Sequence, residues 1–544
     1  MSSRSPDAFR LGAPPYDRGH GDGGEPEDPH ELLQRARRLT ADGHPSAGGA
    51  WERAATALRR AGGSLTPGDH AHALDATALD CRGRALPAAG PLFSRAADLH
   101  ERAGQRGEAV VSRARALLTG PEPGATVCAG LAVLGERATA LHAAGQATAA
   151  ETATVLLLRC RARADLLDTG PDPVAEAAAL RAELVRLTAF AAPHRAAPAV
   201  LGVLAEARAL LGRVTAPDDP VAALGLLRSA AADHHAGGGL RPAAESGLLL
   251  AGVLRATGAH REATAVLRAA LGPAACATPP RGADRARLCL ALARTLAGAS
   301  AEPAGDGEVL ALLGEAVRHA DAPAGDRRLS TLARLALGIA RAERGRWREA
   351  TAVLAEVLSG RAGDGDGAAR VRARAWLAYC ALCLGEPARA AREFARAAAE
   401  VRRWGDRRHG AALSRLTAHA LGAAGSPEKA ARAYERAADL WRSVDDHASA
   451  ASALRARARQ VRRVWGAAAA EAVEEEALRE AGRGRPGDGD GEPGGARAWL
   501  RALPEPYGPP GRYQVDVYGE VGGTGPGGRR RTEEQGVTRV QGCV

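Results

Sequence analysis

Aromatic residues, methionine and lysine are scarce in this chain. Of its 544 residues, 3% are Phe, Trp or Tyr, and there is one Met. Lys429 is the only lysine, Ile339 is the only isoleucine, and asparagine is absent. A Walker-type phosphate loop needs a lysine after its glycines, and Lys429 follows Ser-Pro-Glu, so that class of nucleotide site is excluded. With few aromatic residues, any core must be built from thin layers of Leu, Val and Ala.

Long apolar runs are also missing. No run reaches the roughly 18 residues of a membrane span, and residues 1–28 show no apolar core of a secretory signal. The eight cysteines are spread along the chain, unlike a compact disulfide framework. We therefore expect a cytoplasmic protein without a membrane partner.

The net charge of +10 comes from arginines scattered along the sequence. Nucleic-acid binding needs a clustered basic patch, and the excess of Ala, Arg and Gly is typical of a GC-rich coding sequence. We therefore do not expect a nucleic-acid partner.

Composition divides the chain into four parts. We predict a disordered N-terminal segment at residues 1–28, a helical region at 29–480, a Gly/Pro/Asp linker at 481–496 and a short, largely disordered tail at 497–544. The helical region is interrupted every 12 to 18 residues by Gly, Pro or Asp clusters and shows no strand alternation.

Within the helical region, small and large residues recur with a period of 40. The positions in register are Gly345, Gly385 and Gly425, then Ala350, Ala390 and Ala430, and then Leu354, Phe394 and Tyr434. Residues 258–271 keep the same internal spacing.

The spacing has a physical reason. A glycine ends the first helix of a hairpin because it accepts left-handed backbone angles without steric cost. Pro387 and Pro427, two residues later, suit the first turn of the next helix, and Ser426 is predicted to cap it. The alanine allows two helices to approach closely, and the larger residue four positions later fills the space beyond it.

These residues resemble the tetratricopeptide repeat (TPR) family. Its first helix carries a Leu-Gly or Leu-Ala pair before the turn glycine, here Leu337-Gly338 and Leu377-Ala378, whereas Thr417-Ala418 departs from the pattern. The resemblance implies an all-α solenoid of about eleven TPR-like hairpins, with a period near 40 where the family usually has about 34.

In TPR proteins, first-helix positions line a groove that binds peptides. Carried onto this sequence, the resemblance implies partner-binding roles for Arg372, Tyr379, Arg415 and His419. The family's dicarboxylate clamp for chaperone C-termini uses Lys and Asn along the groove, and this chain lacks those residues there. A chaperone partner of that type is therefore not expected.

No motif with catalytic chemistry stands out. The sequence has no GxSxG and no HExxH. Cys380 and Cys383 form one CxxC inside a helix, which we interpret as two small buried hydrophobic residues. His234 and His235 are interpreted as cations that stabilise a helix end. We therefore predict no catalytic, cofactor or metal site.

The sequence thus favours a non-enzymatic TPR protein that binds a protein or peptide of unknown identity and acts as a scaffold or as the sensing part of a regulatory system. The alternative is a cut-down or truncated arm of a multidomain regulator or of a CHAT-type caspase-like protease, to which such arrays often belong.

Overall fold

The protein is described from a computed structural model. The structure describes residues 28–41, 47–60, 65–83, 88–120, 124–167, 172–237, 240–272, 282–299, 306–321, 327–359, 367–483, 495–501 and 503. Within these ranges the regular structure is helical and no strand occurs.

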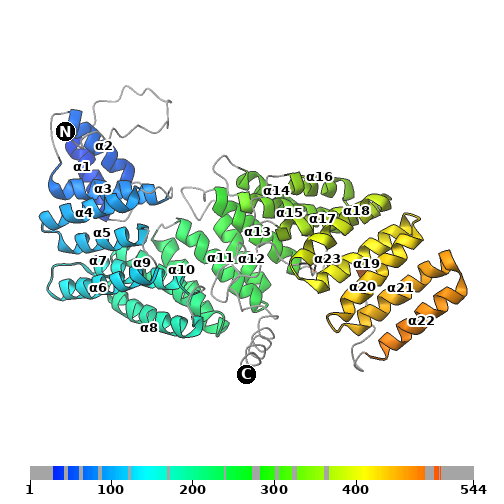
Figure 1. Ribbon diagram of the computed structural model, residues 1–544. Helices are drawn as coiled ribbons and strands as arrows, with labels where there is room; N and C mark the ends of the chain where they lie inside the picture. The colour runs from blue at the N-terminus through cyan, green and yellow to red at the C-terminus, as the bar shows by residue number, and fades with distance from the viewer. Residues whose placement is uncertain are drawn as a thin grey trace, which may run out of the picture. The chain divides into compact units, whose positions relative to one another are not determined.

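The helices follow one another in chain order (Figure 1). They are α1 (Pro29–Ala41), α2 (Ala47–Arg60), α3 (Pro67–Gly83), α4 (Ala89–Arg102), α5 (Arg106–Thr119), α6 (Gly124–Ala143), α7 (Ala149–Asp165), α8 (Pro173–Ala191), the 3₁₀ helix η1 (Ala192–His194), α9 (Pro198–Thr215), α10 (Pro220–Ala236), α11 (Leu240–Ala256), α12 (His260–Leu271), α13 (Gly282–Ala299), α14 (Asp306–Ala320), α15 (Arg327–Glu343), α16 (Trp347–Ser359), α17 (Gly367–Cys383), α18 (Pro387–Arg403), α19 (Arg407–Ala423), α20 (Pro427–Arg442), α21 (His447–Trp465), α22 (Ala467–Ala481) and α23 (Gly495–Arg501).

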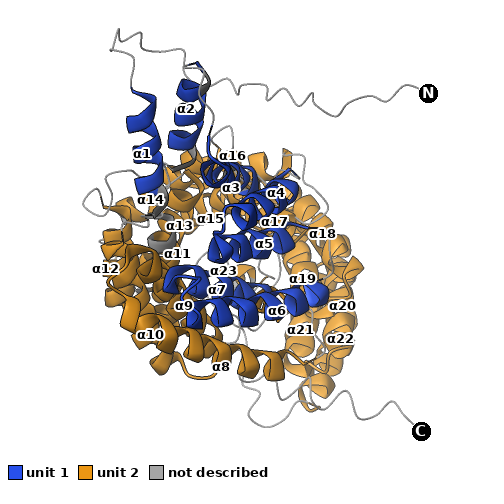
Figure 2. Ribbon diagram, turned by 90° about the vertical axis from the view of Figure 1, so that its left-hand side faces the viewer, with its two compact units in different colours: residues 1–162 blue, residues 163–544 orange. Residues whose placement is uncertain are grey.

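The chain forms two compact units, residues 1–162 and residues 163–544, which Figure 2 shows in different colours. The boundary falls inside α7. The sequence predicts one helical region at residues 29–480, so the division is a finding of the structure. The predicted limits of the linker and the tail stay predictions.

The second unit is an array of antiparallel hairpins. Helices α9 to α22 pack in sequential pairs, and the first helices α9, α11, α13 and α15 each contact the next first helix along the chain. Each hairpin leaves an apolar face that the next hairpin covers. The predicted all-α solenoid is confirmed, and α1 to α22 agree with about eleven hairpins.

The turn glycines have the backbone angles that the repeat predicts. Gly345, Gly385 and Gly425 have φ values of 77°, 78° and 74°. After Gly385, the amide of Glu386 donates to the carbonyl of Ala381 at 2.8 Å, the long-range hydrogen bond of a Schellman motif. The same bond recurs after the other two glycines. Each first helix therefore ends at a left-handed residue that reverses the chain.

Close helix packing explains the alanines and the Leu-Gly pair. Ala350, Ala390 and Ala430 are fully buried. A Cβ added at Gly338 on α15 would lie 2.7 Å from the Leu354 side chain on α16, and Leu354 is itself fully buried. A glycine is therefore required here because a larger residue would occupy the space of Leu354.

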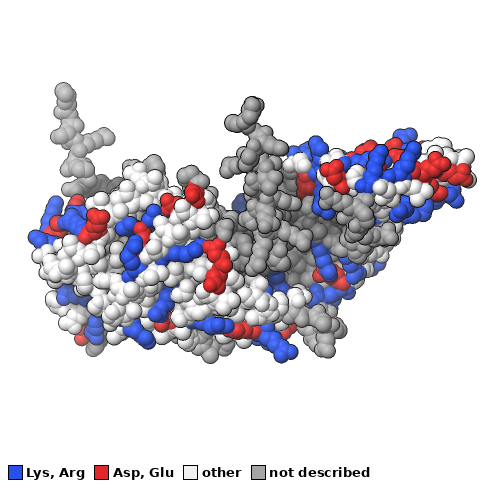
Figure 3. Space-filling view, turned by 90° about the horizontal axis from the view of Figure 1, so that it is seen from below, with Lys and Arg blue, Asp and Glu red and all other residues white. Residues whose placement is uncertain are grey.

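Some arginines form ion pairs between successive second helices. The guanidinium of Arg228 on α10 contacts Glu262 on α12 at 2.7 Å, and that of Arg268 on α12 contacts Glu308 on α14 at 2.8 Å. On the visible face in Figure 3, basic and acidic side chains are interspersed. The arginines here contact acidic partners one repeat away.

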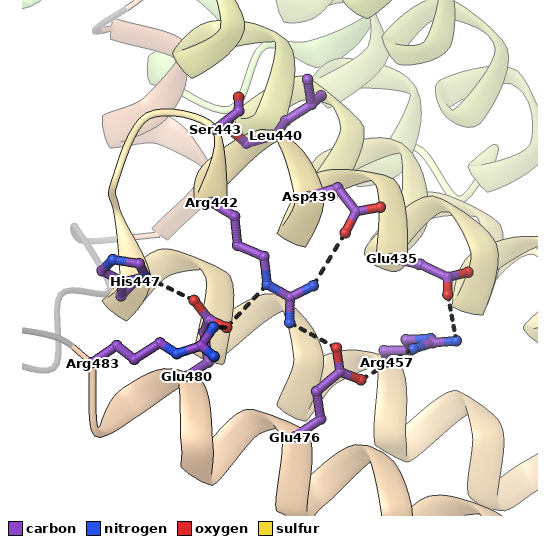
Figure 4. A network of polar contacts seen from close by, with 10 residues as sticks. All are labelled: Glu435, Asp439, Leu440, Arg442, Ser443, His447, Arg457, Glu476, Glu480 and Arg483. Carbon is purple, nitrogen blue, oxygen red and sulfur yellow. Dashed lines mark hydrogen bonds and ion pairs between the residues drawn. The ribbon is translucent and has the colours of Figure 1, made fainter.

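The last hairpin carries a denser network of ion pairs (Figure 4). Arg442 on α20 contacts Glu476 at 2.7 Å and Glu480 at 3.0 Å, both on α22, and His447 on α21 contacts Glu480 at 2.7 Å. Burial alone would raise the pKa of Glu480, but hydrogen bonds from His447 and Arg442 bring it below its usual value. The polar helix α22 is therefore held to α20 and α21 by its acidic residues.

Ser426 is the N-cap residue of α20, as predicted, and Pro427 occupies the first turn, but the Ser426 side chain makes no capping hydrogen bond. Among the described residues, every helix is too short or too polar to cross a membrane.

Candidate functional site: the α17 face and helix α23

A short helix near the C-terminus packs against a first helix of the array. Helix α23 contacts α17, although more than a hundred residues separate them in the chain, and Figure 1 labels the two close together. The segment that contacts α17 runs from Ala496 to Leu503. We call the surface that it covers the α17 face, formed by Glu343, Trp347, Arg372, Trp376 and Tyr379.

Apolar contacts anchor the segment. The side chains of Leu500 and Leu503 are buried, with exposed fractions of 0% and 3%, and belong to the same core cluster as Trp376. Ala496 packs against this cluster with part of its surface exposed. Positions 496, 500 and 503 are four and three residues apart, a spacing that places side chains on one side of a helix. Burying two leucines contributes about 3–6 kcal/mol to holding the segment, before ordering costs are subtracted.

Polar contacts surround the apolar ones. Arg497 donates from Nε to the Tyr379 hydroxyl at 2.8 Å, and its guanidinium lies 5.7 Å from the ring centres of both Trp347 and Tyr379. The hydrogen bond to Tyr379 raises the pKa of Arg497. Burial works against this shift, and the nearby carboxylate of Glu343 adds to it. Arg501 donates to Glu343 at 2.7 Å. The arginines of α23 therefore meet an aromatic pair and a carboxylate.

Two of the four predicted partner-binding residues lie in this face. Arg372 is buried and donates from Nη1 to the carbonyl of Leu503 at 3.1 Å, and Tyr379 receives Arg497. Arg415 and His419 lie on the next first helix, α19, where Arg415 is half-buried and His419 is exposed. Their roles in partner binding stay predictions.

The structure adds residues that the sequence analysis did not name. Trp347 opens α16 and contacts Tyr379 edge-on at 5.8 Å, and Trp376 contacts the same ring at 5.9 Å. The apolar spacing of Ala496, Leu500 and Leu503 was the available signal for α23, but it spans only two turns and falls across the predicted linker and tail.

Two interpretations of single motifs are corrected. Cys380 is fully buried and burial raises its pKa to about 12, but Cys383 is exposed, so only one cysteine of the CxxC is a core residue. His234 is buried near the end of α10, and burial lowers its pKa to about 4. It is therefore neutral at pH 7 and does not act as a cation at the helix end.

Comparisons with known proteins gave matches to solved structures alone; models of protein families and curated protein sequences gave none. BtubC from P. vanneervenii is 17% identical, with 42% of this chain and 90% of that chain covered and a TM-score of 0.34. The P58(IPK) TPR domain is 14% identical, with 84% and 99% covered and a TM-score of 0.22. Yeast Tom70 is 11% identical, with 83% and 96% covered and a TM-score of 0.31. With TM-scores below 0.5, these similarities carry no weight for function.

The repeat assignment is based on the chain's own geometry. Its helices form sequential hairpins, left-handed glycines end the first helices at a 40-residue spacing, and first helices contact one another along the array. The chain is a TPR-like helical repeat protein.

Proposed function

We propose that this chain is a non-enzymatic scaffold that binds another protein through a short helical segment of that partner on the α17 face. The supporting observation is that the chain's own segment 496–503 occupies this face and contacts Arg372 and Tyr379, two residues for which the TPR resemblance implies partner binding. The finer role as the sensing part of a regulatory system and the caspase-like alternative stay predictions.

The contacts of α23 define the chemistry of the partner segment. It would carry apolar side chains at the spacing of Ala496, Leu500 and Leu503, with arginines placed as Arg497 and Arg501 are. The binding mode is a helix laid on a helical surface, in which a few apolar anchors supply affinity and polar contacts fix orientation. Helix α23 would compete with such a partner because both need the same surface.

The test compares the wild-type chain with a variant that releases α23. Leu500→Asp places a charge in the core contact and is expected to free the α17 face, whereas Leu478→Asp, at a 67% exposed position on α22, is the matched control. Each protein is mixed with a labelled peptide of residues 495–503, and binding is followed by fluorescence anisotropy.

We expect Leu500→Asp to bind the peptide at least about ten-fold more tightly than either the wild type or the control, because its face is no longer covered in cis. Adding Tyr379→Ala to Leu500→Asp should abolish this gain. Equal and negligible binding by all folded variants would contradict the proposal and leave α23 as a structural element only.

A further inference from the structure

Two imidazole groups and a carboxylate meet within the first unit, on three consecutive helices. His72 lies on α3, His100 near the end of α4 and Glu108 in the first turn of α5. One ligand atom from each lies within 4.8 Å of the others. The His100 Nδ1 is 3.1 Å from Glu108 Oε2, and the His72 Nε2 is 3.4 Å from the same oxygen.

These separations match those between ligands of one small metal ion. A tetrahedral zinc ion with bonds of about 2.0–2.1 Å holds its ligand atoms roughly 3.3 Å apart. The two measured distances to Glu108 lie on either side of that value. The two contacts with Glu108 therefore have the spacing of atoms that bind one metal ion.

A fourth ligand atom, an oxygen, comes from the turn between α4 and α5. Gln105 follows Gly104, whose φ is 77°, and its Oε1 lies 2.9 Å from His100 Nδ1. On the other side, a Cβ at Gly68 would lie 2.9 Å from this same oxygen. The left-handed turn and the bare backbone at Gly68 thus leave space for the amide beside the cluster.

The other ring nitrogen of His100 faces a carboxylate. Its Nε2 is 3.6 Å from Asp75 Oδ2, and this oxygen accepts from the Ser112 hydroxyl at 2.7 Å and contacts Arg115 at 3.4 Å. In metal sites, a carboxylate behind a ligating imidazole orients the ring and raises its basicity. The side chain of His100 is fully buried, and its Nε2 makes no hydrogen bond of normal geometry in the described part.

Carboxylates surround the two imidazoles. Asp75 contacts Arg115, while Asp69 on α3 is paired with Arg37.

We propose that His72, His100 and Glu108, with Gln105 as a fourth ligand, bind one divalent ion of the zinc class that joins α3, α4 and α5. Two imidazoles and one carboxylate suit Zn²⁺, whereas Mg²⁺ and Ca²⁺ prefer oxygen ligands throughout. The side chains of His72 and Glu108 are 17% and 31% exposed, which gives the ion a path from solvent. Because the ligands come from three helices, the ion acts as a staple within the first unit.

The experiment uses the full-length chain after removal of metals with a chelator. Zinc is added in a competition titration with a chromophoric chelator, and the melting temperature is measured with and without zinc. We expect one ion per chain and a higher melting temperature, since zinc binds the folded state. His72→Gln and Glu108→Gln should each weaken binding at least about ten-fold. The control is His70→Gln, on the same helix but outside the cluster.

Cobalt provides a second measurement that does not depend on variants. Co²⁺ bound by the wild-type chain should give the intense visible bands of a four- or five-coordinate nitrogen and oxygen site. The proposal is overturned if the folded wild type binds no stoichiometric zinc, if cobalt gives the pale spectrum of an octahedral aqua-type complex, or if zinc affinity is the same in His72→Gln, Glu108→Gln and His70→Gln.

Discussion

Two helical glycines, Gly338 and Gly202, differ in the space that surrounds them, so replacing each with alanine should have opposite effects on stability. Gly338 lies against the buried Leu354, whereas a Cβ at Gly202 on α9 would meet nothing within 4 Å. Alanine raises helix stability by about 1 kcal/mol relative to glycine where space allows. At Gly338 this gain is outweighed by overpacking, which costs about 1–3 kcal/mol.

We therefore expect Gly202→Ala to raise the melting temperature and Gly338→Ala to lower it. Differential scanning calorimetry of the two variants beside the wild type measures both shifts. A stabilising Gly338→Ala would show that the α15–α16 contact relaxes at no cost and would remove the packing argument for the Leu-Gly pair.

At the scale of one helix, α22 depends on its acidic side chains for attachment. Glu480 is 2% exposed and joins Arg442 and His447, and the pKa of Glu480 is lowered. A carboxylate with a lowered pKa in the folded state contributes stability above its ordinary pKa of about 4.3, and this contribution is lost as the pH falls through the lowered value. Protonation therefore removes the charge that holds α22.

We expect Glu480→Gln to loosen α22 at pH 7 by about 1–3 kcal/mol, because a buried charge pair loses one partner. Hydrogen exchange measured by mass spectrometry should show faster exchange in α22, by about ten-fold or more, and the wild type should approach the variant below about pH 4. Glu475→Gln, at an exposed position on the same helix, is the control. Equal protection of α22 in all three proteins would contradict the prediction.

At the scale of the whole molecule, the division into two compact units predicts separate responses to perturbation. In repeat arrays, stability is carried by contacts between neighbouring repeats, so a local change propagates weakly. Gly338→Ala lies in the second unit, residues 163–544. We expect it to accelerate hydrogen exchange around α15 and α16 while the exchange rates of α3 to α5 stay as in the wild type. A uniform increase along the chain would indicate one cooperative unit instead.

The sequence predicted the hairpins well because their signals are local. The left-handed turn at Gly385 depends on the absence of a Cβ, and the buried stripe of Ala390 and Phe394 depends on helical spacing. Ser426 does take the N-cap position, but its side chain forms no capping hydrogen bond, because that bond depends on how the chain enters α20, which residue type alone does not fix.

The two candidate sites were harder to predict because their contacts join residues far apart in the sequence. Arg372 and Tyr379 were named because they occupy first-helix positions, but their contacts with Leu503 and Arg497 join segments more than a hundred residues apart. The imidazole and carboxylate cluster draws single residues from three helices and shows no compact spacing in the sequence. Neither set of contacts has a local signature.

The amino-acid sequence by itself determined the helical hairpins, their turn glycines and their packing stripes, because each depends on residues a few positions apart. Only the tertiary structure decided which surface α23 covers, which arginine meets which acidic residue one repeat later, and which histidines come together. These depend on long-range placement, where a chain of similar Ala-, Arg- and Leu-rich helices offers many alternative pairings and packing selects one of them.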